Sequence, residues 1–104
     1  MVTLQKRLLV FVLALSPLVA QERIITSTEL KANANGSSCW IQIDNYVYDI
    51  TPYLSEHATT HEYALVKWCG KDATSGWKDK DGKNKSHSRK AATLLRKYRI
   101  GAMR

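Results

Sequence analysis

The chain contains little cysteine and no long apolar segment. Its only cysteines, Cys39 and Cys69, are 30 residues apart, and this spacing matches no paired zinc-binding motif. The single extended apolar run, residues 8–19, is shorter than the roughly 20 residues that a membrane-spanning helix needs. Internal repeats and low-complexity tracts are also absent. These absences argue against a zinc module, a permanent membrane anchor and a repeat protein.

The first 20 residues have the features of a secretory signal peptide. Lys6 and Arg7 precede the apolar run, and Ala20 offers a small residue for cleavage. We therefore expect a leader at 1–20 and one domain at 21–104, exported to the periplasm or otherwise secreted. An uncleaved anchor is the weaker alternative. The chain has 16 Lys and Arg against 9 Asp and Glu, and the leader removes only two of the basic residues, so the domain stays basic.

The remaining domain is small and needs additional stabilisation. A domain of about 84 residues buries only a little over roughly 60% of the surface that its unfolded chain exposes. An exported chain meets an oxidising compartment, and we therefore expect a disulfide between Cys39 and Cys69. Closing a loop of this length stabilises the folded state by roughly 3 to 4 kcal/mol on the chain-entropy model. The alternative is a pair of buried or metal-binding thiols.

Strand and helix patterns follow one another along the domain. Asp44 and Asn45 separate two segments rich in β-forming residues, which predicts a tight hairpin. Thr51 and Pro52 are typical of a helix start, and Gly70 is typical of a helix end. The expected elements, in chain order, are a helix at 28–34, strands at 39–43 and 46–48, a short helix from 51, a helix at 61–68, a short helical piece near 77 and a helix from 86 or 88.

The last predicted helix is amphipathic. Ala91, Leu94, Leu95 and Tyr98 recur at helical spacing, which places them on one face toward the core. The opposite face is expected to carry the basic residues Arg89, Lys90, Arg96, Lys97 and Arg99.

Several motifs follow one another in an order typical of one family. They are Cys39-Trp40, Val47-Tyr48-Asp49-Ile50-Thr51, His57, Gly70-Lys71-Asp72-Ala73-Thr74, His87-Ser88 and Ile100-Gly101. On these motifs the chain resembles a cytochrome b5-type haem-binding domain and is similar to small exported bacterial members. The resemblance implies an α+β fold, with a small sheet and helix pairs that form a haem crevice, and one noncovalently bound haem b. No Cys-x-x-Cys-His motif for covalent c-type attachment occurs in the chain.

The resemblance also implies which residues hold the haem. His57 and His87 would be the two axial ligands of the iron, and the second ring nitrogen of each would donate to a carbonyl or another acceptor. Ser88 would bond a haem propionate. The residues expected to line the apolar crevice are Ile50, Tyr53, Leu65, Trp77, Leu94 and Tyr98. Each of these apolar residues would also fit ordinary core packing.

The residues after His57 depart from the family pattern. Family members usually have Pro-Gly-Gly there, whereas this chain has Ala58-Thr59-Thr60. Without the glycines, positive φ angles are less accessible, so the turn must differ in shape. His61 is therefore a rival first ligand. We favour His57, because its distance from Val47 matches the family and His61 lies inside a predicted helix.

Two axial histidines leave no open iron position, which suits a single-electron carrier rather than an enzyme. The sequence offers no distal acid, base or substrate pocket. Basic residues flank His87 in the sequence, namely Lys78, Lys80, Lys83, Lys85 and Arg89. A basic surface at this edge of the haem would favour an acidic redox partner, although the same residues could serve only solubility. We expect a monomer that binds no nucleic acid and has no permanent membrane anchor.

The competing hypothesis is a haem-free, disulfide-stapled module that binds anions through its basic face. The three tryptophans could serve as stacking platforms in such a module. They lie, however, in predicted strands and helices, where core packing is the usual role, and export argues against a nucleic-acid partner.

Overall fold

The computed structural model describes residues 21–56, 65–79 and 87–104. His57, His61 and the expected leader at 1–20 lie outside the described residues. The described part forms a six-stranded mixed sheet with short helices, which confirms the predicted α+β class. None of the helices in these ranges has the length and apolar character needed to cross a membrane.

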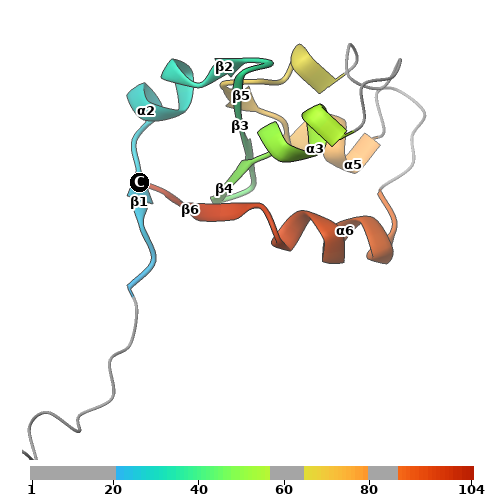
Figure 1. Cartoon of the computed structure of the whole chain (residues 1–104). Coiled ribbons are helices and arrows are strands. Elements are labelled where there is room, and N and C mark those ends of the chain that lie inside the picture. Colours follow the sequence, from blue (N-terminus) through green and yellow to red (C-terminus); the bar gives the residue numbers. More distant parts are fainter. Residues whose placement is uncertain (1–20, 57–64, 80–86) are drawn as a thin grey trace, which may run out of the picture.

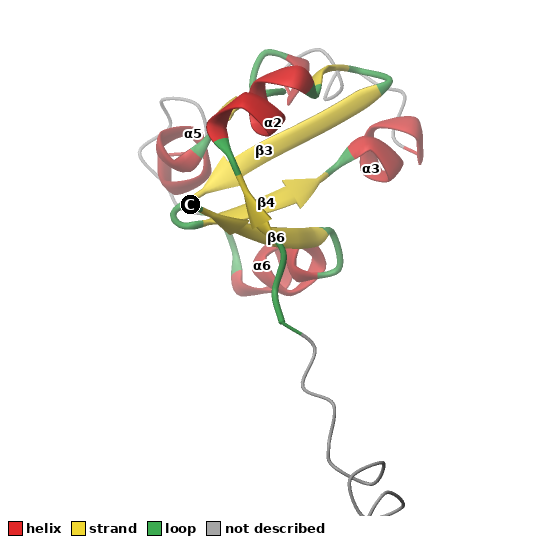
Figure 2. Ribbon diagram, turned by 90° about the vertical axis from the view of Figure 1, so that its left-hand side faces the viewer, coloured by secondary structure: helices red, strands yellow, loops and turns green. Residues whose placement is uncertain are grey.

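The strands follow the order β1-β6-β4-β3-β2 in the sheet, and β5 pairs with β3 beside this path. Figures 1 and 2 show α2 on one side of the sheet and α3, α5 and α6 on the other. The strands are β1 (Ile24–Ile25), β2 (Ala34–Asn35), β3 (Ser38–Ile43), β4 (Tyr46–Asp49), β5 (Lys71–Asp72) and β6 (Arg99–Met103). The helices are α2 (Ser27–Ala32), α3 (Thr51–Glu56), α5 (Thr74–Asp79) and α6 (Arg89–Arg96).

The predicted hairpin is confirmed and forms the centre of the sheet. β3 alternates between buried and half-buried residues, as a strand does when one face packs on the core. Ile43 pairs with Tyr46 across the turn, and Asp44 turns the chain with a φ of 52°. Aspartate tolerates this left-handed region better than most residues.

α2 begins and ends earlier than the sequence pattern predicts. The side chain of Thr26 accepts a hydrogen bond from the backbone N–H of Glu29, and Glu29 in turn accepts one from the Thr26 backbone. This capping box fixes the start at Ser27. The helix ends at Ala32 because Ala34–Asn35 pairs with β3 instead of continuing the helix. The expected helix at 28–34 was therefore displaced toward the N-terminus.

The C-terminal residues form a strand that the sequence analysis did not predict. α6 ends at Arg96, and β6 pairs antiparallel with β4 and parallel with β1. Arg99 therefore lies in a strand and not on the basic side of the helix. At Gly101 a Cβ atom would lie 2.5 Å from the Arg23 carbonyl oxygen, so the close approach of the chain at residue 23 to β6 requires glycine.

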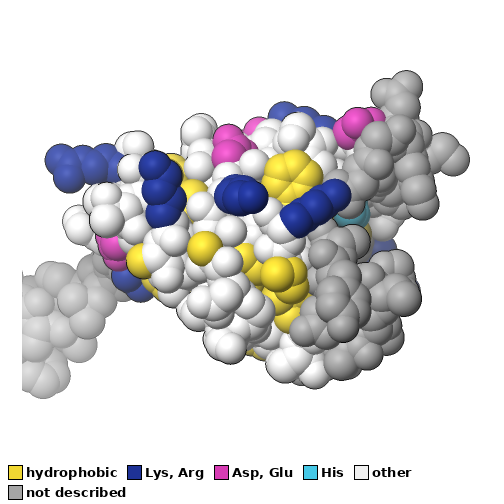
Figure 3. All heavy atoms as spheres, turned by 90° about the horizontal axis from the view of Figure 1, so that it is seen from above, with side chains coloured by type: hydrophobic (Ala, Val, Ile, Leu, Met, Phe, Trp, Pro, Cys, Tyr) yellow, Lys and Arg dark blue, Asp and Glu magenta, His cyan; other side chains and the backbone are white. Residues whose placement is uncertain are grey.

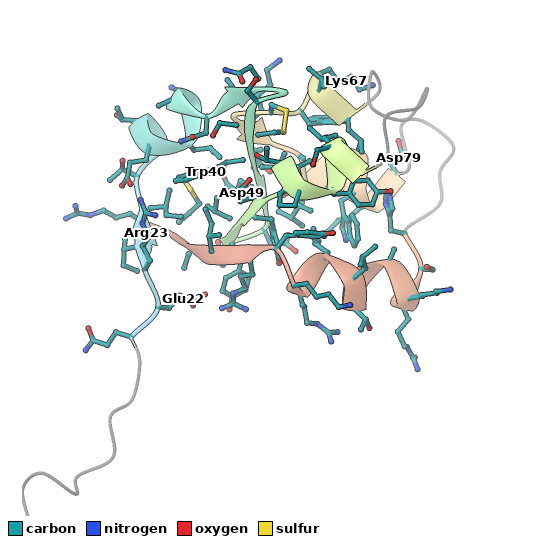
Figure 4. The ribbon with its side chains drawn as sticks, viewed as in Figure 1. Glu22, Arg23, Trp40, Asp49, Lys67 and Asp79 are labelled. Carbon is teal, nitrogen blue, oxygen red and sulfur yellow. A yellow bond between two sulfur atoms is a disulfide. The ribbon has the colours of Figure 1, made fainter. Side chains whose placement is uncertain are left out.

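Two groups of buried side chains cover the two sides of the sheet. The smaller one contains Ile25, Leu30 and Val47 and lies beneath α2, where the Arg23 guanidinium stacks over Trp40 (Figure 4). The larger one lies toward α3, α5 and α6 and contains Cys39, Ile41, Ile43, Tyr48, Ile50, Leu54, Cys69 and Ala73. This larger core is the platform for the candidate site.

Cys39 and Cys69 form the predicted disulfide, with an S–S distance of 2.00 Å. Both are buried in the larger core. The bond joins β3 to the residues just before Gly70, whose φ of 76° ends the preceding turn. Most of the helix expected at 61–68 lies outside the described residues, but Leu65 and Val66 are helical. The disulfide thus ties the end of that segment to the sheet.

Candidate functional site

His87 lies between α5 and α6 and makes two hydrogen bonds to the same acceptor. Its backbone N–H donates to the Trp77 carbonyl oxygen over 3.3 Å, and the ring Nδ1 lies 2.6 Å from that oxygen. A carbonyl oxygen can only accept, so the proton is on Nδ1. In the neutral form of the ring Nε2 then has the free lone pair, which is the state that a metal-ligating imidazole requires.

The ring of His87 is also held by the side chain of Trp77. The indole and imidazole rings are parallel within 4°, with their centroids 4.2 Å apart. The backbone carbonyl and the indole of one residue thus fix both the tautomer and the plane of the histidine. Sequence reasoning placed Trp77 in the crevice wall but did not identify it as the partner of His87.

α5 positions Trp77 because the sheet anchors its first turn. The backbone N–H of Ala73 donates to the Gln42 carbonyl over 2.7 Å, and the Thr74 hydroxyl accepts from the Asp44 backbone N–H over 2.8 Å. At Gly76 an added Cβ would lie 2.6 Å from the Trp68 ring. The glycine therefore lets Trp68 pack directly against α5, next to the residue that holds His87.

α6 starts directly after His87 because Ser88 caps it. The Ser88 hydroxyl oxygen accepts from the backbone N–H of Ala91 over 3.1 Å, which satisfies one free amide of the first turn. The hydroxyl proton stays available to donate. The capping role is compatible with the predicted bond to a propionate, and that bond stays a prediction.

A hollow of about 520 Å³ runs along α6. It is an open depression on the surface and not an enclosed cavity. Leu94 is 39% exposed there, which is unusual for a leucine on the apolar side of an amphipathic helix and leaves apolar surface for a ligand to cover. The residues that line the hollow are Ser88, Lys90, Ala91, Thr93, Leu94 and Lys97.

The other predicted crevice residues belong to the larger core or pack against it. Ile50 is buried, whereas Tyr53, Leu65 and Tyr98 are partly buried beside it. Tyr53 on α3 meets the ring of Tyr98 edge-on, with centroids 6.3 Å apart. This contact brings α3, which leads to His57, next to the residues that follow α6. Their packing in the core is established, and their contact with haem stays a prediction.

The basic surface predicted around His87 is described only in part. Lys78 forms an ion pair with Asp44 at 3.0 Å, so its charge is compensated, and Lys80, Lys83 and Lys85 lie outside the described residues. Arg89, the remaining member of the predicted set, is exposed at the start of α6. No group of three or more His, Cys, Asp or Glu that could hold a bare metal ion occurs among the described residues.

The residues present fit a planar iron-containing group. A neutral imidazole with a free Nε2 supplies an iron ligand, and the partly exposed Leu94 with Ala91 supplies apolar surface beside it.

Comparison with known proteins identifies the family. The pattern of the family described as cytochrome b5-like haem/steroid-binding domain matches residues 26–104. The soluble cytochrome b558 of Ectothiorhodospira shaposhnikovii is 35% identical over 80 residues, which cover 77% of this chain and 86% of that protein. Cytochrome b5 of Drosophila melanogaster is 31% identical over 83 residues, covering 80% of this chain and 58% of the relative.

A solved structure agrees with these matches. The fold is similar to that of Ectothiorhodospira vacuolata cytochrome b558, described as a prokaryotic homologue of cytochrome b5, with a TM-score of 0.71 and 32% identity. The superposition covers 79% of this chain and 99% of that one. The haem-free module considered as an alternative has no comparable support. The chain therefore belongs to the cytochrome b5-like family and is an electron carrier that binds b-type haem.

Proposed function

We propose that this chain is an exported single-electron carrier whose haem iron is bound by His57 and His87. The observation that carries the proposal is the hydrogen bond from Nδ1 of His87 to the Trp77 carbonyl, which leaves Nε2 as the free base. A bound b-type haem supplies an iron that exchanges one electron between its ferric and ferrous states. The protein's part is to hold the ligands and to exclude water.

His57 is proposed as the second ligand because it directly follows α3, which lies next to the site. The Thr51 hydroxyl accepts from the Cys39 backbone N–H over 2.8 Å, and Leu54 is fully buried in the larger core. The start of α3 is thereby fixed to the disulfide-bonded strand, and His57 follows the last residue of α3 directly. His61 remains the rival ligand.

Two histidine ligands would keep the iron closed to oxygen and other small molecules. With His57 and His87 both holding the group, no ligand would need to be exchanged during one-electron transfer, which would favour a fast rate to a docked protein. His87 is well suited to this role, because its ring is held on both an edge and a face by Trp77.

Export is supported by two independent features. Lys6, Arg7 and the apolar run at 8–19 match a signal peptide. The buried disulfide between Cys39 and Cys69 is typical of an oxidising compartment. We propose the periplasm as the destination, and a monomer as the working form. N-terminal sequencing of the exported protein should begin at Gln21; retention of residues 1–20 in the exported form would contradict cleavage.

The ligand assignment is tested by absorption spectra of oxidised and dithionite-reduced protein. Wild type should show a six-coordinate low-spin spectrum, and His57→Ala and His87→Ala should each convert it to a five-coordinate or haem-free form. His61→Ala is the matched control and should keep the wild-type spectrum. Loss of the low-spin spectrum in His61→Ala but not in His57→Ala would transfer the role to His61. A folded protein without a Soret band after haem addition would contradict haem binding.

A further inference from the structure

The exposed side of α6 carries positive charge and no negative charge. Its charged residues are Arg89, Lys90, Arg96 and Lys97, which we call the α6 basic face. All four are exposed, and side chains that end in nitrogen project from α6 away from the sheet (Figure 4). No ion pair among the described residues includes any of them.

Charge is distributed differently on other parts of the molecule. The ion pairs of the described residues join Arg23 to Glu29, Lys78 to Asp44 and Arg99 to Glu22. On the face that carries α2 and β5, basic side chains are interspersed with acidic and apolar ones (Figure 3). Within the described ranges, no acidic side chain is paired with the α6 basic face.

The stability of α6 does not explain this charge. The N-terminus of a helix carries a partial positive charge, so acidic residues stabilise the first turn and basic residues weaken it. α6 has no acidic residue in its first turn and begins with Arg89 and Lys90 instead. Only Arg96 and Lys97, at the other end, favour the helix. A role outside the helix accounts for the first two residues.

The α6 basic face also borders apolar surface. Lys90 and Lys97 lie one helical turn on either side of Leu94, and all three line the hollow beside α6. Leu94 is 39% exposed. Leu94 is one of the residues expected to contact haem, so Lys90 and Lys97 border the proposed haem site. His87 directly precedes this helix, so a protein docked here lies beside the proposed iron ligand.

We propose that the α6 basic face is the docking surface for a redox protein whose own contact surface is acidic. This inference rests on the proposed function, because it assigns the partner of the same site. Positive charge attracts an acidic protein over long range and raises the association rate at low ionic strength. The class of partner is inferred from the positive charge of the α6 basic face, and no particular redox protein is assigned.

The first test is binding, and it does not use electron transfer. A 15N-labelled sample of the protein as purified, including any bound haem, is titrated with an acidic blue-copper protein. A separate sample is titrated with a basic c-type cytochrome. We expect amide shift changes at 87–97 with the acidic protein at low salt, and their loss as salt is raised. Absence of shifts at 87–97, or stronger binding of the basic protein, would overturn the proposal.

The variant for both tests is Arg89→Glu/Arg96→Glu, because neither residue lines the hollow. The matched control is Lys31→Glu/Lys71→Glu, which makes the same change in net charge on α2 and β5, at the opposite side of the molecule (Figure 1). Both variants are first checked for an unchanged Soret band and melting temperature. Reversal of two charges on the docking face should weaken binding of the acidic protein about tenfold, and the control should change it less than twofold.

The second test is the rate of electron transfer from the reduced protein, measured by stopped flow. Oxidation by the acidic blue-copper protein should slow about tenfold in Arg89→Glu/Arg96→Glu at low salt, and the difference should shrink as ionic strength rises. Equal slowing in the control variant would show a net-charge effect and overturn the assigned surface. Binding at 87–97 by anionic lipid vesicles or DNA, without binding of the acidic protein, would overturn the assigned partner.

The two hypotheses fail in different ways. If the protein takes up no haem, the spectra contradict the proposed function, while the amide titration still decides whether α6 binds an acidic protein. If the low-spin spectrum is present and the amide titration shows no contact at 87–97, the proposed function stands and the docking surface is wrong.

Discussion

Trp77 holds His87 twice, through its carbonyl oxygen 2.6 Å from Nδ1 and through an indole ring stacked 4.2 Å from the imidazole. The carbonyl belongs to the backbone, so replacement of the side chain separates the two contacts. The hydrogen bond sets the tautomer, and the stacking sets the plane of the ring. The next prediction uses this separation.

Trp77→Leu should retain the tautomer of His87 and lose the stacking. Aromatic pairs contribute about 0.5 to 1.5 kcal/mol beyond their buried area, so haem should dissociate about threefold to tenfold faster. Transfer of haem to an apoprotein acceptor measures this rate. Trp77→Phe keeps an aromatic ring and is the control. Equal dissociation rates in the two variants would show that stacking does not matter.

The disulfide should contribute strongly to stability. Removal of a native disulfide from a small secreted domain costs about 2 to 5 kcal/mol, and both sulfur atoms are buried in the larger core. Cys39→Ala/Cys69→Ala should therefore unfold at lower urea concentration than wild type. Wild type measured with and without reductant is the internal comparison. A double variant as stable as the oxidised wild type would contradict the prediction.

Gly101→Ala should weaken the junction between the N- and C-terminal segments. The added Cβ would lie 2.5 Å from the Arg23 carbonyl oxygen, and relief of such overpacking typically costs about 1 to 3 kcal/mol. Urea denaturation gives the loss. Gly36→Ala is the matched control, because no heavy atom lies within 4 Å of its added Cβ. A loss of similar size at both glycines would argue against the close contact.

The capping box of α2 should make stability depend on acidic pH. The hydrogen bond from Arg23, followed by that from the Thr26 backbone, lowers the pKa of Glu29 below its usual value of 4.5. A carboxyl whose pKa is lower in the folded state stabilises it above the unfolded pKa, and this contribution is lost as pH falls through the folded pKa. Glu29→Gln should thus be less stable than wild type at pH 7.

The same comparison at a pH below the lowered pKa of Glu29 in the folded protein provides the check. Both proteins then carry an uncharged side chain at this position, so their free energies of unfolding should converge. Glutamine can still accept the backbone hydrogen bond of the capping box, and the variant therefore isolates the charge. A difference that persists unchanged at low pH would assign the effect to geometry.

Local signals in the sequence were sufficient for the hairpin, the disulfide and the start of α3. Asp44-Asn45 is a two-residue turn between alternating strands, and the two cysteines had no other partner. The short strands β1, β5 and β6 were missed because two to five residues carry no periodicity of their own. They become strands only when the sheet offers them hydrogen bonds, which is a tertiary effect.

The sequence predicted which residues belong to the site but not the contacts between them. The motif order pointed to His87 and to Trp77 near it. The hydrogen bond from the His87 ring to the Trp77 backbone carbonyl could not be predicted, because every residue has such a carbonyl and the sequence does not show which one is used. Leu94 was expected in a crevice wall and lines a hollow beside α6. Of the basic residues predicted around His87, Lys78 is paired with Asp44 and Arg89 is exposed at the start of α6, whereas Lys80, Lys83 and Lys85 lie outside the described residues.

The parallel pairing of Ile24–Ile25 with Ala102 and Met103 has a consequence for folding during synthesis. This pairing joins residues almost 80 positions apart, so loop closure must precede it. Among the described strands, β1 is the first to leave the ribosome, yet it pairs only with β6, which is made last. The edge of the sheet that β1 forms can therefore be completed only after the whole described chain has been made.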